Sequence, residues 1–328
     1  MKRKLEITRK LEFMAVSSHP KKLGNLLENS VAILNLPASF HCDKGCPGCV
    51  MQKDDAILKE REGALPRWKI FSLISEFSEK FGTKFITING RGGPLHPMVK
   101  GETLEKIQYA EARGISSYLF TSGDYLEPET CELLAALGSN VMISLLGNGF
   151  LDKDFFSGRE YQGTPKTIAG NVRMLISAFR DSRNQPEEGL TRLGMNYVVS
   201  RRDLKKPARL RELKKAANDN GIFFVCNVDF EPDLNPFRRA RLLRLAKECS
   251  DFNLSHSTSV KGICQMGAGS SLTIAPDGSI YHCPYMYEGS DGNITTVSEE
   301  QLLRIAARYI TQEQYACIKR KTKAQKKR

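Results

Sequence analysis

The sequence lacks the features that mark membrane, secreted and fibrous proteins. The nearest candidate for a membrane span, residues 133–151, carries no charge but is interrupted by Gly138, Gly147 and Gly149. It is interpreted instead as the end of a helix followed by a strand. Residues 1–10 are charged and no apolar segment follows them, so we expect no secretory signal. The 26 glycines and 14 prolines are too few for a collagen-like or low-complexity repeat.

The cysteine content argues against a disulfide framework as well. The nine cysteines are odd in number, and a chain of 328 residues with 41% hydrophobic and 26% charged residues can fold around its own core. The length allows one large domain, or a large domain with a small one attached. Cysteines without a signal sequence indicate metal or redox chemistry in a reducing cytoplasm. We therefore predict a cytoplasmic protein with no membrane partner.

The charge is concentrated at the two ends. Of the formal charge of +12, +7 lies in residues 319–328 and +4 in residues 1–10, which leaves +1 for the 308 residues between them. Residues 319–328 are interpreted as a basic, disordered tail, although such a tail can also bind nucleic acid or acidic surfaces. The near-neutral body argues against a nucleic-acid partner, because such domains normally carry their charge on the folded face.

Alternating strand and helix patterns predict an α/β fold. Short apolar runs rich in β-forming residues alternate with amphipathic helical stretches over residues 31–230, which is typical of βα units. The expected strands are 31–36, 84–89, 117–121, 140–145, 193–199 and 222–229, and the expected helices are 67–81, 103–113, 127–137, 167–180 and 205–218. Six strands with five helices predict an open parallel sheet or a partial barrel.

The pattern changes after residue 232. A basic helix is expected at residues 237–249, and its interleaved leucines favour an ordinary amphipathic helix over a nucleic-acid reader. Residues 271–282 are interpreted as a β-hairpin whose turn is Pro276-Asp277-Gly278, with the glycine supplying a positive φ.

The strongest chemical signal is HCDKGCPGC at residues 41–49. Cys42, Cys46 and Cys49 have the spacing C-x3-C-x2-C and directly follow the first expected strand. Thiolates select soft metals, and a loop this short can hold three corners of a cubane iron–sulfur cluster while leaving one iron free. A zinc site completed by His41 or a distant cysteine is the alternative.

This motif resembles that of the radical S-adenosylmethionine (SAM) superfamily. The resemblance covers residues 31–230 and implies a partial (βα)6 barrel, a [4Fe–4S] cluster on the three cysteines, and SAM bound to the open iron. It also implies an electron donor such as flavodoxin or ferredoxin. In that family, one-electron reduction cleaves SAM to methionine and a 5′-deoxyadenosyl radical, which removes a hydrogen atom from a peptide or small-molecule substrate.

Further motifs follow in the family's order at the strand ends. Gly92 and Gly93 resemble the glycine-rich stretch at the methionine end of SAM, and Gly93 stands where the family usually has an acid. Thr121-Ser122-Gly123 stands where the family often has Thr-Asn-Gly. Ser144 matches the family's ribose-contacting serine, and Asn196 is a weaker match. The resemblance thus implies the cofactor-binding residues Gly92, Gly93, Thr121, Ser144 and Asn196.

A second cysteine pattern lies near the C-terminal end. Cys264, Gly278 and Cys283 form C-x13-G-x4-C around the expected hairpin, and Cys317 follows in an expected last helix. The pattern resembles the SPASM/twitch extension, in its shorter form, and implies an auxiliary iron–sulfur cluster on Cys264, Cys283 and Cys317. Cys249 or a substrate atom could complete that site. The alternative is that Cys264 and Cys317 are buried small hydrophobic residues.

These patterns predict an N-terminal segment (residues 1–30), a core barrel (31–232), an auxiliary-cluster region (233–318) and the tail. By analogy we expect a radical SAM oxidoreductase or maturase that modifies a peptide or protein. With only about 30 residues before the first strand, we expect no separate leader-peptide-binding domain there, which counts mildly against a peptide substrate. The alternatives are dehydrogenation of a small polyol or aminosugar, and a non-catalytic zinc or RNA-binding protein.

Overall fold

The fold is a curved sheet with helices along its outer side. The computed structural model describes residues 31, 33–38, 64–89, 92–144, 166–182, 192–201, 203–228, 235–251, 271–281 and 290–310. Its elements are β1 Ile33–Asn35, α4 Arg67–Phe81, β2 Phe85–Ile88, α5 Lys100–Glu111, β3 Ser116–Thr121, α6 Pro128–Leu137, β4 Asn140–Ser144, α8 Lys166–Asp181, β5 Leu193–Val199, α9 Pro207–Asp219, β6 Phe223–Val228, α10 Pro236–Cys249, β7 Ser271–Ile274, β8 Ile280–Tyr281 and α11 Glu299–Ile310. None of these helices is long and apolar enough to cross a membrane.

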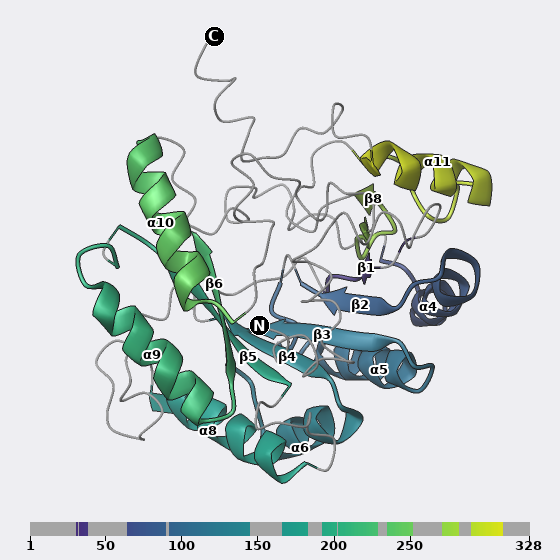
Figure 1. Ribbon diagram of the computed structural model, residues 1–328. Helices are drawn as coiled ribbons and strands as arrows, with labels where there is room; N and C mark the ends of the chain where they lie inside the picture. Colours follow the sequence, from purple (N-terminus) through teal and green to yellow (C-terminus); the bar gives the residue numbers. More distant parts are fainter. Residues whose placement is uncertain are drawn as a thin grey trace.

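The eight strands form one sheet in the order β6-β5-β4-β3-β2-β1-β7-β8. Strands β1 to β6 are parallel and lie in sequence order, as successive βα units place them. In Figure 1 the helices that connect them form an arc around the outside of the sheet. The six predicted strands and five predicted helices are all present, so the predicted α/β fold with a partial barrel is confirmed.

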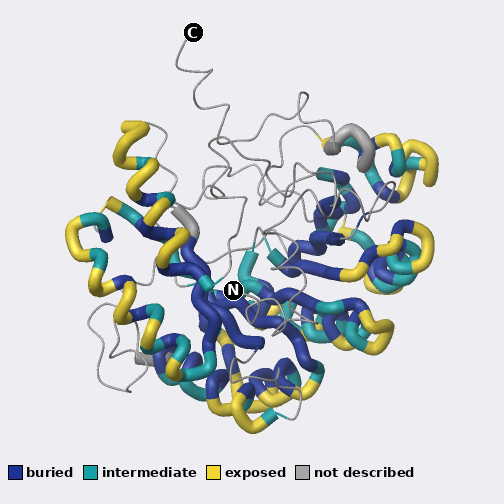
Figure 2. The backbone as a smooth tube through the Cα atoms, in the orientation of Figure 1, coloured by how far each residue is buried: buried dark blue, intermediate teal, exposed yellow. Residues whose placement is uncertain are grey.

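The outer layer forms because apolar side chains recur at helical spacing. The buried side chains of α8 follow each other at spacings of one or three positions, so they share one helix face: Ile168, Ala169, Val172, Leu175, Ile176 and Phe179. They share one core cluster with alternate residues of the strands, such as Val141 and Ile143 of β4. Figure 2 shows the strands buried and the outward sides of the helices exposed. Met142 and Ser144, which alternate with these residues, therefore point to the inner face of the sheet.

Tight packing at Gly194 closes the inner face of the sheet on the side of the amino ends of the strands. A Cβ atom placed on Gly194 would lie 2.1 Å from Cε2 of Phe223 and 2.5 Å from Sδ of Met142. Met142 and Gly194 are register partners in β4 and β5, and Gly194 pairs with Phe223 in β6. The missing side chain at position 194 thus admits two large apolar side chains, which form an apolar floor.

The C-terminal hairpin extends the sheet. Strands β7 and β8 are antiparallel and Gly278 has a φ of 83°, which confirms the predicted hairpin and its turn. Strand β7 also pairs in parallel with β1, and Nδ2 of Asn35 donates a hydrogen bond of 3.2 Å to the carbonyl oxygen of Leu272. The hairpin therefore covers the β1 edge, while α10 packs on β6 at the other end (Figure 1).

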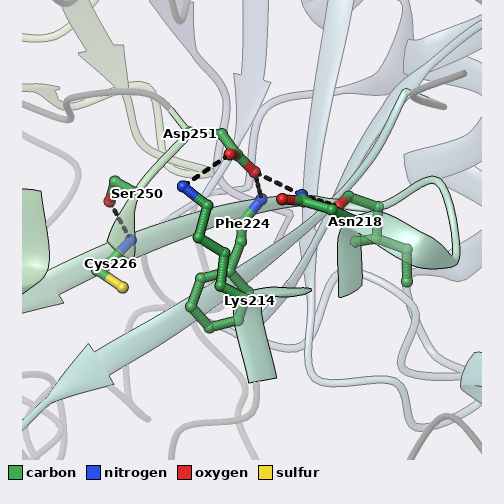
Figure 3. A network of polar contacts seen from close by, with 7 residues as sticks. Lys214, Asn218, Phe224, Cys226, Ser250 and Asp251 are labelled. Atoms are coloured by element: carbon green, nitrogen blue, oxygen red, sulfur yellow. Dashed lines mark hydrogen bonds and ion pairs between the residues drawn. The ribbon is translucent and has the colours of Figure 1, made fainter. Parts of the chain in front are cut away.

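The chain after α10 caps the exposed edge of β6. The backbone N–H of Asp251 donates to the carbonyl oxygen of Phe224 (2.7 Å), and Oδ2 of Asp251 accepts from the N–H of Phe224 (2.7 Å). The same carboxylate accepts from Asn218 of α9 (2.7 Å) and pairs with Lys214 (3.0 Å) (Figure 3). Oγ of Ser250 accepts from the N–H of Cys226 (2.7 Å). These contacts satisfy an edge strand that would otherwise be open to other chains.

Replacing Asp251 with alanine is expected to lower the free energy of unfolding by about 3 kcal/mol, because it leaves a buried N–H and the half-buried Lys214 without their partner. Asp251→Asn keeps an acceptor oxygen for Phe224 and should fall between alanine and wild type. Chemical denaturation measures the effect. Glu248→Gln is the control, since its ion pair with Arg211 is exposed and should contribute little. Equal losses in Asp251→Ala and the control would contradict the edge-capping role.

Candidate active site at the carboxyl edge of the sheet

The predicted cofactor-binding residues lie at the carboxyl ends of the parallel strands or in the loops that follow them. Ser144 ends β4, Thr121 ends β3, and Gly92 and Gly93 lie in the loop after β2. Asn196 lies within β5, opposite Ser144. Open parallel sheets bind their ligands at this edge, outside the carboxyl ends of the strands.

Ser144 and Asn196 form a polar pair on the inner face. They are register partners, and Nδ2 of Asn196 donates a hydrogen bond of 3.3 Å to Oγ of Ser144. Both residues are half-buried. Met142 and Gly194, which form the apolar floor with Phe223, lie two residues earlier in the same two strands and face the same side of the sheet. A hydroxyl that accepts from Asn196 keeps its own O–H to donate. The pair can therefore offer a hydrogen-bond donor to a ligand above the floor.

The loop after β2 leaves space beside Gly93. Gly92 has a φ of 84°, a conformation that residues with a side chain rarely adopt. The φ of Gly93 is not positive, and among the described residues a Cβ atom there would meet only Cβ of His96, at 3.7 Å. The carbonyl oxygen of Gly93 accepts from the N–H of His96 (2.9 Å), which holds the loop. The open side of Gly93 suits close approach of a ligand to the backbone.

Thr121 has a structural role in the turn after β3. Its side chain is buried, and its Oγ1 accepts a hydrogen bond of 3.2 Å from the N–H of Gly123. Nδ2 of Asn171, on α8, donates to the carbonyl oxygen of Gly123 (3.1 Å). These contacts fix the turn at the edge of the site, and a direct contact of Thr121 with a cofactor stays a prediction. The part played by Asn171 carried no sequence signal, because it comes from a distant helix.

An aromatic pair that the sequence did not indicate links two loops at this edge. His96 follows β2, Tyr125 follows β3, and their rings meet edge-on with centroids 5.3 Å apart. Tyr125 has a φ of 54°, which is unusual for a bulky residue. An ion pair between Lys100 and Glu127 joins the same two regions. The only available sequence signal was the position of both residues just after a strand.

The predicted cluster ligands Cys42, Cys46, Cys49, Cys264, Cys283 and Cys317 lie outside the described residues, so their ligand roles stay predictions. Cys131, Cys226 and Cys249 are described and buried. Burial raises the pKa of Cys131 to about 12 and also raises the pKa of Cys226 and Cys249. Cys249 belongs to the core cluster, and its role as the ligand that completes an auxiliary site stays a prediction. Among the described residues, no three acidic, histidine or cysteine side chains gather as a metal site.

Comparison with solved structures identifies the fold. SuiB of Streptococcus suis, bound to the precursor peptide SuiA, superposes with a TM-score of 0.57 and 15% identity over 90% of this chain and 70% of SuiB. SuiB bound to SAM gives a TM-score of 0.56 and 16% identity over 89% of this chain and 69% of SuiB. anSMEcpe with bound SAM gives 0.54 and 14% identity over 83% of this chain and 80% of anSMEcpe.

The fold is that of the radical SAM enzymes. The predicted radical SAM barrel is thus confirmed as a fold, at an identity too low to transfer activity or substrate. No protein-family model matches the sequence, and no curated protein matches it either. The radical SAM fold places the Ser144–Asn196 pair and the Gly93 loop on the edge at which the resemblance expects SAM.

Proposed function

We propose that this chain is a radical SAM enzyme that modifies a peptide or protein. The observation that carries the proposal is the Ser144–Asn196 hydrogen bond at the carboxyl edge of a radical SAM fold, the fold of two SAM-bound proteins. The C-x3-C-x2-C spacing of Cys42, Cys46 and Cys49 supports it from the sequence. The function rests on both together, because the fold alone hosts more than one chemistry.

The described residues fit SAM at this edge. Ser144 would hold the ribose through its free O–H, and Asn196 would fix the direction of that O–H. The backbone at Gly92 and Gly93 would lie against the methionine end, where the open side of Gly93 leaves room. When bound, a [4Fe–4S] cluster supplies the single electron that cleaves SAM to methionine and a 5′-deoxyadenosyl radical. The apolar floor of Met142 and Phe223 keeps water from reaching the site from below.

Ser144→Ala is expected to weaken SAM binding about fivefold, because one hydrogen bond contributes about 1 kcal/mol. Gly93→Val should weaken it more, since the branched side chain fills the space kept for the ligand while the backbone conformation allows it. Equilibrium dialysis with labelled SAM under anaerobic conditions measures both. Ser72→Ala, on the outer helix α4, is the control and should bind as wild type. Wild-type affinity in Gly93→Val would contradict the assignment of this loop.

The peptide or protein substrate is supported by the neighbouring structures. SuiB is bound to its precursor peptide SuiA, and anSMEcpe, at a TM-score of 0.53 and 12% identity over 88% of this chain and 81% of anSMEcpe, is bound to the Cp18Cys peptide. A polyol or aminosugar stays the alternative. Anaerobic turnover with deuterated peptides, and separately with deuterated polyols and aminosugars, distinguishes the classes. Deuterium should enter 5′-deoxyadenosine from the peptides, and entry only from the sugars would contradict the proposal.

We also propose that Cys264, Cys283 and Cys317 hold an auxiliary iron–sulfur cluster. The turn at Gly278 between the first two cysteines is the hairpin that pairs with β1, so their flanking segments start from a fixed element of the sheet. Cys283→Ala should lower the iron content while leaving SAM cleavage without substrate intact. The buried Cys131→Ala is the matched control and should retain all iron. Full iron in Cys264→Ala, Cys283→Ala and Cys317→Ala would return these residues to ordinary structural cysteines.

A further inference from the structure

The first turns of α10 are mostly exposed. Its buried side chains, Leu242, Leu245, Ala246 and Cys249, all lie at residue 242 or later. None of residues 236–241 is buried. Figure 2 shows the far end of this helix as exposed. The hydrophobic packing that holds α10 on the sheet therefore involves the later turns and gives the first turns no structural role.

These turns lie on the same edge as the candidate active site. The N–H of Asp251 donates to Phe224, which places the end of α10 beside the start of β6. The helix consequently runs antiparallel to β6 and begins at the carboxyl edge. Its 14 residues span about 21 Å, whereas Phe224 to Val228 spans about 13 Å, so the first turns extend past the strand ends. Figure 1 shows this projection of α10.

The positive charge in the first two turns of α10 opposes helix stability. Arg238, Arg239 and Arg241 lie in the first two turns, and the first turn contains no acidic residue. Positive side chains at a helix N-terminus are unfavourable, because they meet the positive end of the helix dipole. None of the three guanidinium groups makes an ion pair with a described residue, while Arg211 and Lys215 on the adjacent surface are paired with Glu248 and Asp219. Three of the cations of α10 are thus gathered in its first two turns, and Arg244 and Lys247 follow further along the helix.

An exposed aromatic ring lies on the same face of the helix as Arg241. Phe237 is 82% exposed, the highest value among the large hydrophobic side chains of the described residues. The backbone N–H of Phe237 donates to Oδ1 of the N-cap residue Asn235 (2.9 Å), which fixes the backbone from which the ring extends. An exposed apolar ring with Arg241 four residues on, and with two further arginines on the same two turns, is complementary to an apolar side chain flanked by carboxylates.

We propose that residues 235–241, the α10 docking surface, bind an acidic polypeptide segment that carries an apolar side chain. The segment would bind across the first turns of α10 and so be held beside the candidate active site. The exposed ring and its arginines span only about two helical turns, which disfavours a nucleic acid that would need a longer continuous basic face. This surface involves neither iron nor SAM, so its test is independent of the proposed enzyme activity.

Binding of a fluorescein-labelled peptide of alternating glutamate and glycine with one central leucine tests the proposal by anisotropy. The variant R238Q/R239Q/R241Q should bind about tenfold more weakly, as expected for three weak surface contacts. F237A should weaken binding of this peptide but not of a version in which glycine replaces the leucine. The matched control is R209Q/R211Q/K215Q on α9, which removes the same charge and should bind nearly as wild type.

Folding of the triple variant is checked by thermal unfolding. Because the arginines oppose the helix dipole, R238Q/R239Q/R241Q should be at least as stable as wild type, so lost binding cannot be attributed to lost structure. Added salt should weaken peptide binding to wild type and have less effect on the triple variant. Wild-type affinity in the triple variant, or an equal loss in the α9 control, would overturn the proposal. So would tighter binding of a single-stranded RNA than of the peptide by the same arginines.

Discussion

Gly194→Ala is expected to lower the free energy of unfolding by about 3 kcal/mol. The new methyl group would overlap the ring of Phe223 and the sulfur of Met142, both closer than 3 Å to the Cβ position. Gly194 and Met142 lie in β5 and β4, each paired on both sides, so their backbone cannot move without disturbing the parallel pairing. Overpacking of a closed core commonly costs about 1–3 kcal/mol. The upper end of that range is expected here because two neighbours clash with the same atom.

Chemical denaturation gives the value, and two further variants identify its cause. Gly170→Ala is the control: it lies inside α8, a Cβ there meets nothing within 4 Å, and alanine should stabilise the helix by about 0.5–1 kcal/mol. Phe223→Leu, combined with Gly194→Ala, should recover part of the loss because it removes the overlapping ring atoms. If Gly194→Ala unfolded at the wild-type denaturant concentration, the apolar floor would be wrongly described.

The sheet order of the core could be predicted because each βα unit is local. The spacing of hydrophobic residues changes from that of a strand to that of a helix and back again, which marks each βα unit. The helical connection then places the second strand parallel to the first and beside it. The pairing of β7 with β1 could not be predicted in this way. It joins Asn35 to Thr273, and neither residue's neighbours in sequence specify a partner so distant. The edge cap at Asp251 was equally hidden, since a lone aspartate after a helix has many possible partners.

The candidate site was predictable where strand ends are predictable. Ser144 and Asn196 belong to strands that the predicted sheet places side by side, so their proximity was predictable. The hydrogen bond between them was not, because it depends on the strand register and a shift of one residue would break it. The turn contact of Thr121 and the left-handed backbone of Tyr125 depend on loop conformations. Side-chain identity alone does not specify loop conformation, so sequence reasoning missed both.

Replacing Cys42, Cys46 and Cys49 together with alanine is expected to remove about four irons per chain, the content of one cubane cluster. The thiolates are the only protein groups that the spacing assigns to that cluster, so no partial site should remain. Cys131→Ala, which removes a buried thiol with a raised pKa, should keep all the iron and is the matched control. Iron and acid-labile sulfide analysis of anaerobically purified protein gives the content. Zinc without sulfide in the wild-type protein would support the zinc alternative instead.

The most direct measurement of the central claim is the formation of 5′-deoxyadenosine from SAM. Wild-type protein, reconstituted with iron and sulfide and reduced under anaerobic conditions, should release 5′-deoxyadenosine and methionine in equal amounts. The triple cysteine variant should release neither, and the Cys131→Ala control should match wild type. Release of 5′-deoxyadenosine by the triple variant at the wild-type rate, or a wild-type protein that holds iron and sulfide yet leaves SAM intact, would contradict the assignment of radical SAM chemistry to this chain.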